Sequence, residues 1–120
     1  MITPLTCSLA GQHEKVQILP GTRARALYSS TAAMEDFYCN YGVNPDFRQR
    51  LEESGLIVSG TGPSGEIRIV ELETHPFFMP TLFLPQTRST AASPHPLLAG
   101  FAAAVNRHWQ NHRRVGAFAQ

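Results

Sequence analysis

The sequence predicts an α/β or α+β fold, in which a mixed sheet with hairpins packs against two or three helices. Three observations lead to this prediction. Turn residues separate short apolar segments, as in the Thr-Gly-Pro-Ser-Gly run over 61–65. A helix start signal stands at Asn44-Pro45. In the C-terminal segment, apolar residues recur at helical spacing along one stripe: Leu98, Phe101, Val105 and Trp109.

The first third of the chain is expected to form a hairpin, a short helix and a further strand. Apolar segments at 6–10 and 15–19 read as two strands joined by a polar turn at 11–14. Residues 22–28 follow Pro20-Gly21 and are long enough for about two helical turns. The aromatic-rich segment 34–43 is expected to be one strand, on which Glu35, Phe37, Cys39 and Tyr41 would share a face.

The middle of the chain predicts a helix followed by a second hairpin. Asn44 is expected to cap a helix that begins at Pro45 and stops at Gly55. Strands are expected at 56–60 and 66–73, on either side of the 61–65 turn. The apolar residues of the second strand do not keep one parity, so this strand is either covered on both faces or bulged near Ile69.

The last third is expected to hold a short buried strand at 81–85, a polar loop at 86–93 and a helix that starts at Ser93-Pro94. Its aromatic side chains are expected mainly to fill the core, although one stripe could instead seal an interface: Phe77, Phe78, Phe101 and Trp109.

Composition and length narrow the classes of protein to consider. At 120 residues the chain has room for one domain, 1–120, and its 42% hydrophobic and 16% charged residues exclude disorder. Two cysteines are too few for a disulfide framework, so the cytoplasm is the expected location. The N-terminal residues lack the pattern of a signal peptide, and no apolar run is long enough to span a membrane.

Charge is distributed unevenly along the chain. All nine acidic residues lie at or before Glu73, four arginines follow it, and Lys15 is the single lysine. Nucleic-acid binding is not expected, because such proteins gather many more cations among aromatics. His108 and His112 lie one helical turn apart but have no third metal ligand nearby in the sequence, so neither a metal nor another cofactor is expected.

Several segments, in this order and spacing, resemble the C-terminal half of the class I glutamine amidotransferase domain of CTP synthase. They are CSLAGQ, LPGTRARALY, NYGVNPDFRQRLEESGLIVSGT, VELETHPFF, TLFLPQ and PHPLLAGF. The resemblance is strongest to the stand-alone CTP synthase C-terminal region-related proteins. It implies a partial class I glutamine amidotransferase fold, which is flavodoxin-like.

The resemblance also implies a Cys-His-Glu triad, from which this sequence departs. No GxCxG-type nucleophile motif is present, since neither Cys7 nor Cys39 has glycine on both sides. The FHPE motif of the family aligns with residues 83–86, where Leu84 replaces the base and Gln86 the carboxylate. The family's Arg- and His-rich stretch, which helps to hold glutamine, is replaced at 37–40 by Phe-Tyr-Cys-Asn.

These departures predict a diverged domain that acts as a small-molecule-binding or accessory subunit. Two alternatives remain: a thiol-dependent enzyme that uses Cys39 on an amide, nitrile or related carbonyl-type substrate, and one half of a split amidotransferase whose nucleophile comes in trans. The candidate catalytic residues are Cys39, Glu35 and His75, with His75 relevant only if the fold places it beside Cys39. The candidate ligand-binding residues are Tyr38, Asn40, Tyr41, Phe83, Gln86 and Arg88.

A half-domain is expected to expose an apolar sheet edge or face that the rest of the family domain would cover. We therefore expect either a homo-oligomer or a separate chain that supplies the N-terminal half.

Overall fold

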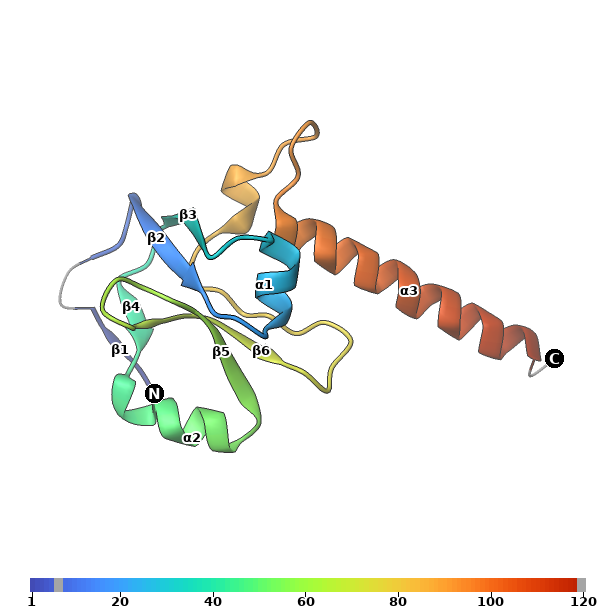
Figure 1. Cartoon of the computed structure of the whole chain (residues 1–120), viewed down its shortest axis with the longest axis horizontal. Coiled ribbons are helices and arrows are strands. Elements are labelled where there is room, and N and C mark those ends of the chain that lie inside the picture. The colour runs from blue at the N-terminus through green and yellow to red at the C-terminus, as the bar shows by residue number, and fades with distance from the viewer. Residues whose placement is uncertain (6–7, 119–120) are drawn as a thin grey trace.

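The computed structural model describes residues 1–5 and 8–118, and its side chains through Arg113 (Figure 1). Its strands are β1 (Ile2–Pro4), β2 (Gln12–Ile18), β3 (Ala32–Phe37), β4 (Tyr41–Val43), β5 (Leu56–Thr61) and β6 (Ile67–Leu72). Its helices are α1 (Arg23–Tyr28), α2 (Arg48–Glu53) and α3 (Pro96–Phe118), with 3-10 helices η1 (Pro45–Phe47) and η2 (Pro85–Arg88). The α/β class with three α-helices in the described residues is as predicted.

A curled four-stranded sheet with the order β3-β2-β5-β6 forms the body of the molecule, and each neighbouring pair is antiparallel. The predicted hairpin of 6–10 with 15–19 is wrong. Strand β2 instead pairs with β3, in a continuous register from Gln12↔Phe37 to Gln17↔Ala32. Residues 8–10 lie outside any strand, and Cys7 lies outside the described residues. Helix α1 supplies the connection that turns the chain back so that β3 can lie beside β2.

The segment 78–84 bonds to both outer strands of this sheet. Leu72 N donates to Phe78 O at 3.2 Å and Leu82 N donates to Arg68 O at 3.0 Å, so the segment follows β6. Leu84 N then donates to Asp36 O of β3 at 3.1 Å. The strand predicted at 81–85 is therefore reduced to isolated pairs at Thr81 and Phe83, because the segment crosses from one outer strand to the other.

Strands β5 and β6 form the second predicted hairpin, with a register shift at Gly60, opposite Ile69. A Cβ atom at Gly60 would lie 2.5 Å from Ile69 Cγ1, so only glycine fits here. Most side chains of β6 are buried, and the bulge predicted near Ile69 is confirmed.

The single strand predicted over 34–43 is wrong, because it is interrupted between β3 and β4. Phe37 ends β3 and is fully buried, and β4 then pairs with β1 in a separate two-stranded sheet. Gly42 permits this second pairing, since a Cβ there would lie 2.7 Å from Leu5 Cδ2. The break means that Glu35 and Cys39 do not share one strand face.

The ends of α1 and of the η1–α2 segment follow the predicted local signals. Thr22 caps α1 by accepting from Arg25 N at 3.1 Å, and buried Glu71 accepts from Arg23 N at 2.7 Å and from Ala24 N at 3.1 Å. Asn44 Oδ1 accepts from Asp46 N at 3.0 Å to begin η1. Gly55 ends the α2 segment with φ of +99°, a conformation that favours glycine.

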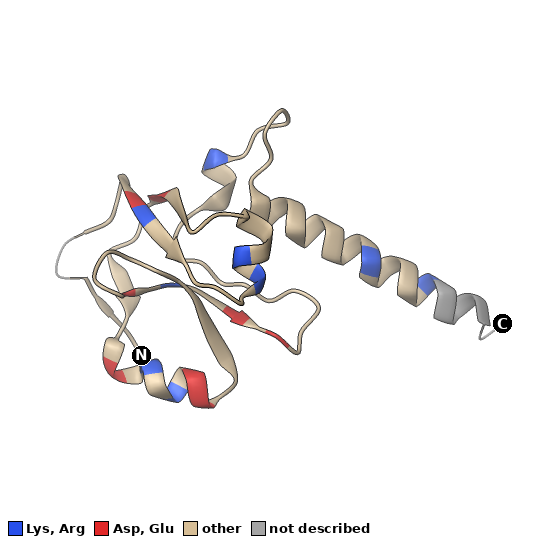
Figure 2. Ribbon diagram, viewed as in Figure 1, with Lys and Arg blue, Asp and Glu red and all other residues tan. Residues whose placement is uncertain are grey.

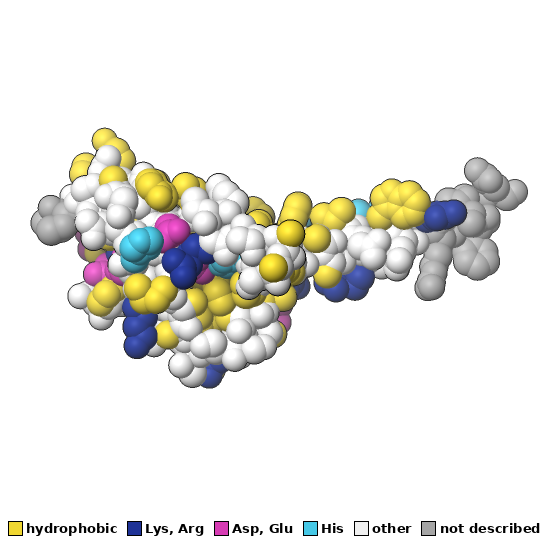
Figure 3. All heavy atoms as spheres, turned by 90° about the horizontal axis from the view of Figure 1, so that it is seen from above, with side chains coloured by type: hydrophobic (Ala, Val, Ile, Leu, Met, Phe, Trp, Pro, Cys, Tyr) yellow, Lys and Arg dark blue, Asp and Glu magenta, His cyan; other side chains and the backbone are white. Residues whose placement is uncertain are grey.

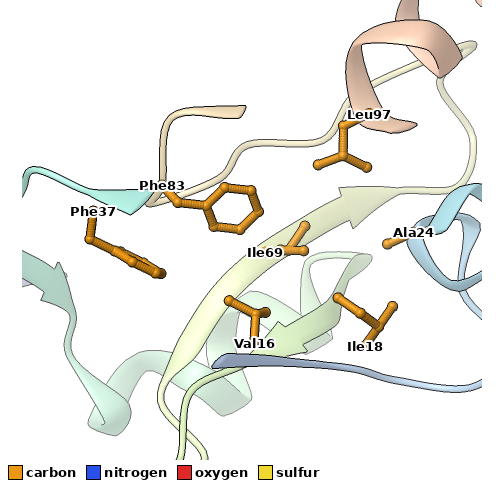
Figure 4. Close-up of a cluster of buried hydrophobic side chains, with 7 residues drawn as sticks. All are labelled: Val16, Ile18, Ala24, Phe37, Ile69, Phe83 and Leu97. Atoms are coloured by element: carbon orange, nitrogen blue, oxygen red, sulfur yellow. The ribbon is translucent and has the colours of Figure 1, made fainter. Parts of the chain in front are cut away.

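The hydrophobic core lies between the sheet, α1 and the first turn of α3 (Figure 4). Phe37 and Phe83 meet in its middle with ring centroids 5.7 Å apart in a T-shaped arrangement. The full cluster comprises Val16, Ile18, Ala24, Phe37, Ile69, Phe83 and Leu97. Phe83 belongs to this core and is 1% exposed, so its side chain is not on the surface where a ligand-binding role was predicted.

Helix α3 begins at Pro96 rather than at Ser93-Pro94 and projects away from the body (Figure 1). The radius of gyration is 16.2 Å, above the about 14 Å of a compact chain of this length. Phe101 and Trp109, predicted to fill core, are 51% and 57% exposed, and Phe78 is also exposed. Exposed apolar side chains thus lie on α3, and others lie on the strands, namely Ile2 of β1, Met34 of β3 and Tyr41 of β4. None of the described helices has the length and apolar character needed to cross a membrane.

Candidate functional site

The predicted ligand-binding segment 38–41 forms the break between β3 and β4. Tyr38 and Tyr41 are exposed, and the Asn40 side chain accepts a hydrogen bond from the Ser8 hydroxyl. The Asn40 carbonyl also accepts from Leu5 N at 2.8 Å, which fixes the backbone of the break. The side chains of Tyr38, Asn40 and Tyr41 thus lie on one short segment whose backbone is held by a hydrogen bond to Leu5.

Cys39 is half-buried beside the core. Burial raises the pKa of the Cys39 thiol, and the charge of the Arg68 guanidinium opposes this only in part. Arg68 is itself buried, stacks over the Phe37 ring at 5.5 Å, and lies 3.4 Å from a Glu14 carboxylate oxygen. Cys39 therefore has the environment of a protonated thiol rather than of a nucleophilic thiolate.

Glu35 is 1% exposed, and its carboxylate bonds to His95 and Tyr28. His95 Nε2 lies 2.7 Å and 3.0 Å from the two carboxylate oxygens, and the Tyr28 hydroxyl donates to Glu35. His95 Nδ1 accepts from Leu97 N at 3.1 Å, so the ring proton resides on Nε2 and is donated to Glu35. Burial and the hydrogen bond to Glu35 raise the pKa of Tyr28, which keeps this hydroxyl a donor.

His95 was not among the sequence-predicted site residues, since 60 residues separate it from Glu35 and no local pattern links them. Its one local signal is its position directly before Pro96, where a polar side chain can cap a helix.

His75 lies in the turn after β6, where its Nδ1 accepts from Phe77 N at 3.1 Å and its ring faces Phe78. Glu35 has His95 and Tyr28 as its hydrogen-bond partners. The structure thus does not join Cys39, Glu35 and His75 in a triad-like chain of hydrogen bonds.

The loop that aligns with the family's FHPE motif runs beside Asp36 of β3. Thr87 Oγ1 donates to the Asp36 carboxylate at 2.8 Å, His13 Nδ1 also bonds to it, and Arg88 lies 3.5 Å away. The Thr87 hydrogen bond, with the nearby His13 and Arg88, lowers the pKa of Asp36 even though desolvation acts against it. Arg88 thus forms an ion pair with Asp36. The sequence predicted only a ligand-binding role for Arg88.

His13 and Asp36 face each other in the β2–β3 register. The turn predicted at 11–14 is wrong, because β2 already begins at Gln12; His13 lies on this strand and its side chain is exposed. Leu84 and Gln86 are both exposed on this side of the molecule.

A cavity of about 470 Å³ lies between the turn after β6 and α3. Its lining is mainly apolar and aromatic: His75, Pro76, Phe77, Phe101, Ala104, Val105, His108, Trp109 and His112. Within residues 1–5 and 8–118, no three His, Cys, Asp or Glu side chains gather as a metal ion would need.

No protein-family model matches the chain. The sequence is 43% identical over 89 residues to a protein named CTP synthase from Trichormus variabilis, covering 73% of this chain and 16% of that protein. It is 41% identical over 96 residues to CTP synthase from Flavobacterium johnsoniae, covering 78% of this chain and 18% of that protein. The chain thus spans less than a fifth of the length of these relatives.

Two of the solved structures that match the chain show its fold. One is the glutaminase domain of Trypanosoma brucei CTPS with bound acivicin, with a TM-score of 0.74 and 27% identity, covering 83% of this chain and 40% of that one. The other is described as a GMP synthase subunit from Thermoplasma acidophilum, with a TM-score of 0.68 and 12% identity, covering 94% of this chain and 52% of that one. The second likeness concerns the fold alone.

Proposed function

The chain is homologous to part of the glutamine amidotransferase domain of CTP synthase, and from this we propose that it is a diverged amidotransferase-like domain without glutaminase chemistry of its own. In this proposal it is a cytoplasmic accessory subunit that binds a small molecule. The binding surface would consist of Tyr38, Asn40 and Tyr41, together with Gln86 and Arg88 of η2.

The observation that carries the proposal is the pair of side chains in the FHPE-like loop. Leu84 is a hydrocarbon and can neither take nor donate a proton, and Gln86 carries no charge that could orient an imidazole. Cys39, with a raised pKa, offers no thiolate to replace the nucleophile of the family. Glu35 is held by His95 and Tyr28 and is not available to a third group.

Glutamine hydrolysis tests the proposal directly. The isolated chain incubated with L-glutamine should release no glutamate or ammonia beyond a buffer blank. The double variant Leu84→His, Gln86→Glu should remain inactive as well, because it restores the base and its carboxylate without a nucleophile. Turnover by the unmodified chain would refute the proposal.

One half of a split amidotransferase is the second candidate. The chain covers 40% of the T. brucei glutaminase domain, and in this candidate another polypeptide would supply the nucleophile. If this is its role, glutaminase activity should appear only when the chain is mixed with that polypeptide. The Leu84 and Gln86 side chains weigh against it, since they lie in the half that is present.

A further inference from the structure

A second cavity, of about 310 Å³ and here called the basic cavity, lies between the start of α1, the turn after β6 and one side of α3. Among the described residues its lining holds cationic and amide side chains and no carboxylate: Arg23, Pro76, Ala104, Arg107, His108 and Asn111. In Figure 3 hydrophobic side chains follow one side of the projecting helix, and a Lys or Arg side chain lies on the opposite side. The basic cavity thus differs in chemistry from the apolar cavity beside it.

The two helices that carry the arginines are packed directly against each other. A Cβ atom at Gly100 of α3 would lie 2.7 Å from Leu27 Cδ1 of α1, so the two helices approach closely at this point. Ala104, one turn farther along α3, is buried and lines the cavity together with Arg23, the first residue of α1. The helix packing therefore fixes the two walls of the basic cavity relative to each other.

The Arg23 side chain is oriented by groups that leave its charge uncompensated. Its Nη1 donates to the carbonyl oxygens of His75 at 3.2 Å and Pro76 at 3.0 Å, and neither acceptor carries a net charge. The carboxylate of Glu71 accepts from the backbone N–H groups of Arg23 and Ala24 instead. Within the part of the chain whose side chains are described, Nε and Nη2 of Arg23 donate to no protein atom. These two nitrogens therefore have donors left for a ligand.

The opposite wall brings a second guanidinium group to the cavity. Arg107, His108 and Asn111 lie three or four residues apart on α3, and so they share one side of the helix. Arg107 forms no ion pair with any carboxylate of residues 1–5 and 8–113. Neither α1 nor α3 contains Asp or Glu, and Figure 2 shows basic residues on both helices. Unpaired positive charge on a concave surface attracts anions.

From the two guanidinium groups and the fixed walls, we propose that the basic cavity binds the phosphate group of a small phosphorylated molecule. The three terminal oxygens of a phosphate monoester point in different directions, so they can accept from α1 and from α3 at once. A carboxylate has two oxygens, which a single guanidinium fork already satisfies. The cavity volume reaches the lower end, about 300 Å³, of the usual range for small-molecule sites, which leaves room for the rest of a small ligand.

This inference does not rest on the proposed function, because the basic cavity shares no residue with the surface of Tyr38, Asn40 and Tyr41. Glutamine turnover by a chain that still binds phosphate would refute the proposed function and leave the phosphate site standing.

Calorimetric titration of the full chain with inorganic phosphate, at an ionic strength held constant with sodium chloride, tests the site. We expect saturable binding of one phosphate per chain, and acetate should bind at least about tenfold more weakly. Arg107→Gln should weaken phosphate binding at least about tenfold, because it removes the charged fork from α3. Arg113→Gln is the matched control, since it removes the same charge from the same helix outside the cavity lining. It should change the affinity by less than about twofold.

Thermal unfolding gives a second measurement, which also shows that the variants fold. Phosphate should raise the midpoint temperature of the unmodified chain and of Arg113→Gln, but not that of Arg107→Gln, because a ligand stabilises only a protein that binds it. Arg107 is exposed and holds no partner in the described residues, so Arg107→Gln without phosphate should unfold near the temperature of the unmodified chain.

Four outcomes would overturn the proposal. Phosphate binding that does not saturate, or that both arginine variants weaken equally, would mean that the general positive charge of α3 attracts anions. Acetate binding as tight as phosphate binding would mean that the site takes carboxylates. Binding to phosphatidic acid vesicles, or to a single-stranded oligonucleotide, that free phosphate does not compete away would mean that a lipid surface or a nucleic acid supplies the phosphates.

Discussion

His95 Nε2 lies 2.7 Å from Oε2 of Glu35, and this contact ties the start of α3 to β3 across the core. The two side chains are 4% and 1% exposed. The other ring nitrogen of His95 accepts from Leu97 N, so the same imidazole satisfies a buried carboxylate and caps a helix. This side chain thus holds the start of α3 to the body, together with Leu97 in the core and the contact of Phe101 with Phe77.

Replacing His95 with Ala should destabilise the protein by about 3 kcal/mol or more, because it leaves a buried carboxylate short of a partner and a helix N–H without a cap. Urea unfolding would measure the loss. His108→Ala is the matched control on the exposed part of α3 and should change stability by less than about 0.5 kcal/mol. Equal effects of the two variants would contradict this account of His95.

Asp36 should make folding stability depend on pH in the acid range. Its folded-state pKa is lowered from the ordinary 3.8, so its contribution is present above that value and is lost as pH falls through the folded-state pKa. In Asp36→Asn, the decrease in unfolding free energy between about pH 6 and about pH 3 should be smaller than in the unmodified chain. Asp46→Asn, at an exposed position of η1, should keep the unmodified slope.

Glu71 should prove to be structural. It accepts from two backbone N–H groups at the start of α1, so Glu71→Gln should cost about 1–3 kcal/mol in unfolding free energy. Glu73→Gln changes an exposed carboxylate just past β6 and should have little effect. If the Glu73 variant were the less stable of the two, the capping role of Glu71 would be wrong.

At the bulge in β5, substitutions of the neighbouring residues Ser59 and Gly60 should have opposite effects on stability. Gly60→Ala would press a methyl group against Ile69 and should cost about 1–3 kcal/mol. Ser59→Ala should be neutral or stabilising, because the Ser59 hydroxyl is buried without a hydrogen-bond partner. Thermal unfolding of both variants would show whether the order holds.

Cys39 should react slowly with iodoacetamide at neutral pH. Since burial raises its pKa, the alkylation rate in a Cys7→Ser background should still be rising as pH passes the ordinary thiol value of 9.0. A rate that reaches its plateau near neutral pH would indicate a thiolate. That outcome would favour the thiol-dependent enzyme over the accessory role.

Local signals in the sequence were sufficient for the helix caps and the bulged hairpin. Asn44 and Gly55 begin and end a helical segment through contacts with residues next to them, and the parity break at Ile69 is visible in the strand itself. Strand partners were harder to predict, because the pairing of β2 with β3 depends on how α1 returns the chain. No local pattern could predict that choice.

The candidate site shows the same limit. The sequence pointed to Glu35 but not to His95, which lies 60 residues away, and it did not reveal that Arg88 lies beside Asp36. The apolar period of α3 correctly predicted a helix. It could not tell that Phe101 and Trp109 stay more than half exposed, since a period shows which residues share a face and not what covers it.

The crossing of residues 78–84 from β6 to β3 has a consequence for how this molecule can meet others. Main-chain groups of Arg68, Leu72 and Asp36 are already engaged by that crossing. A strand of another chain would have to displace residues 78–84 before it could pair with β6 or β3 at these positions. This requirement opposes fibril growth and donor-strand exchange there.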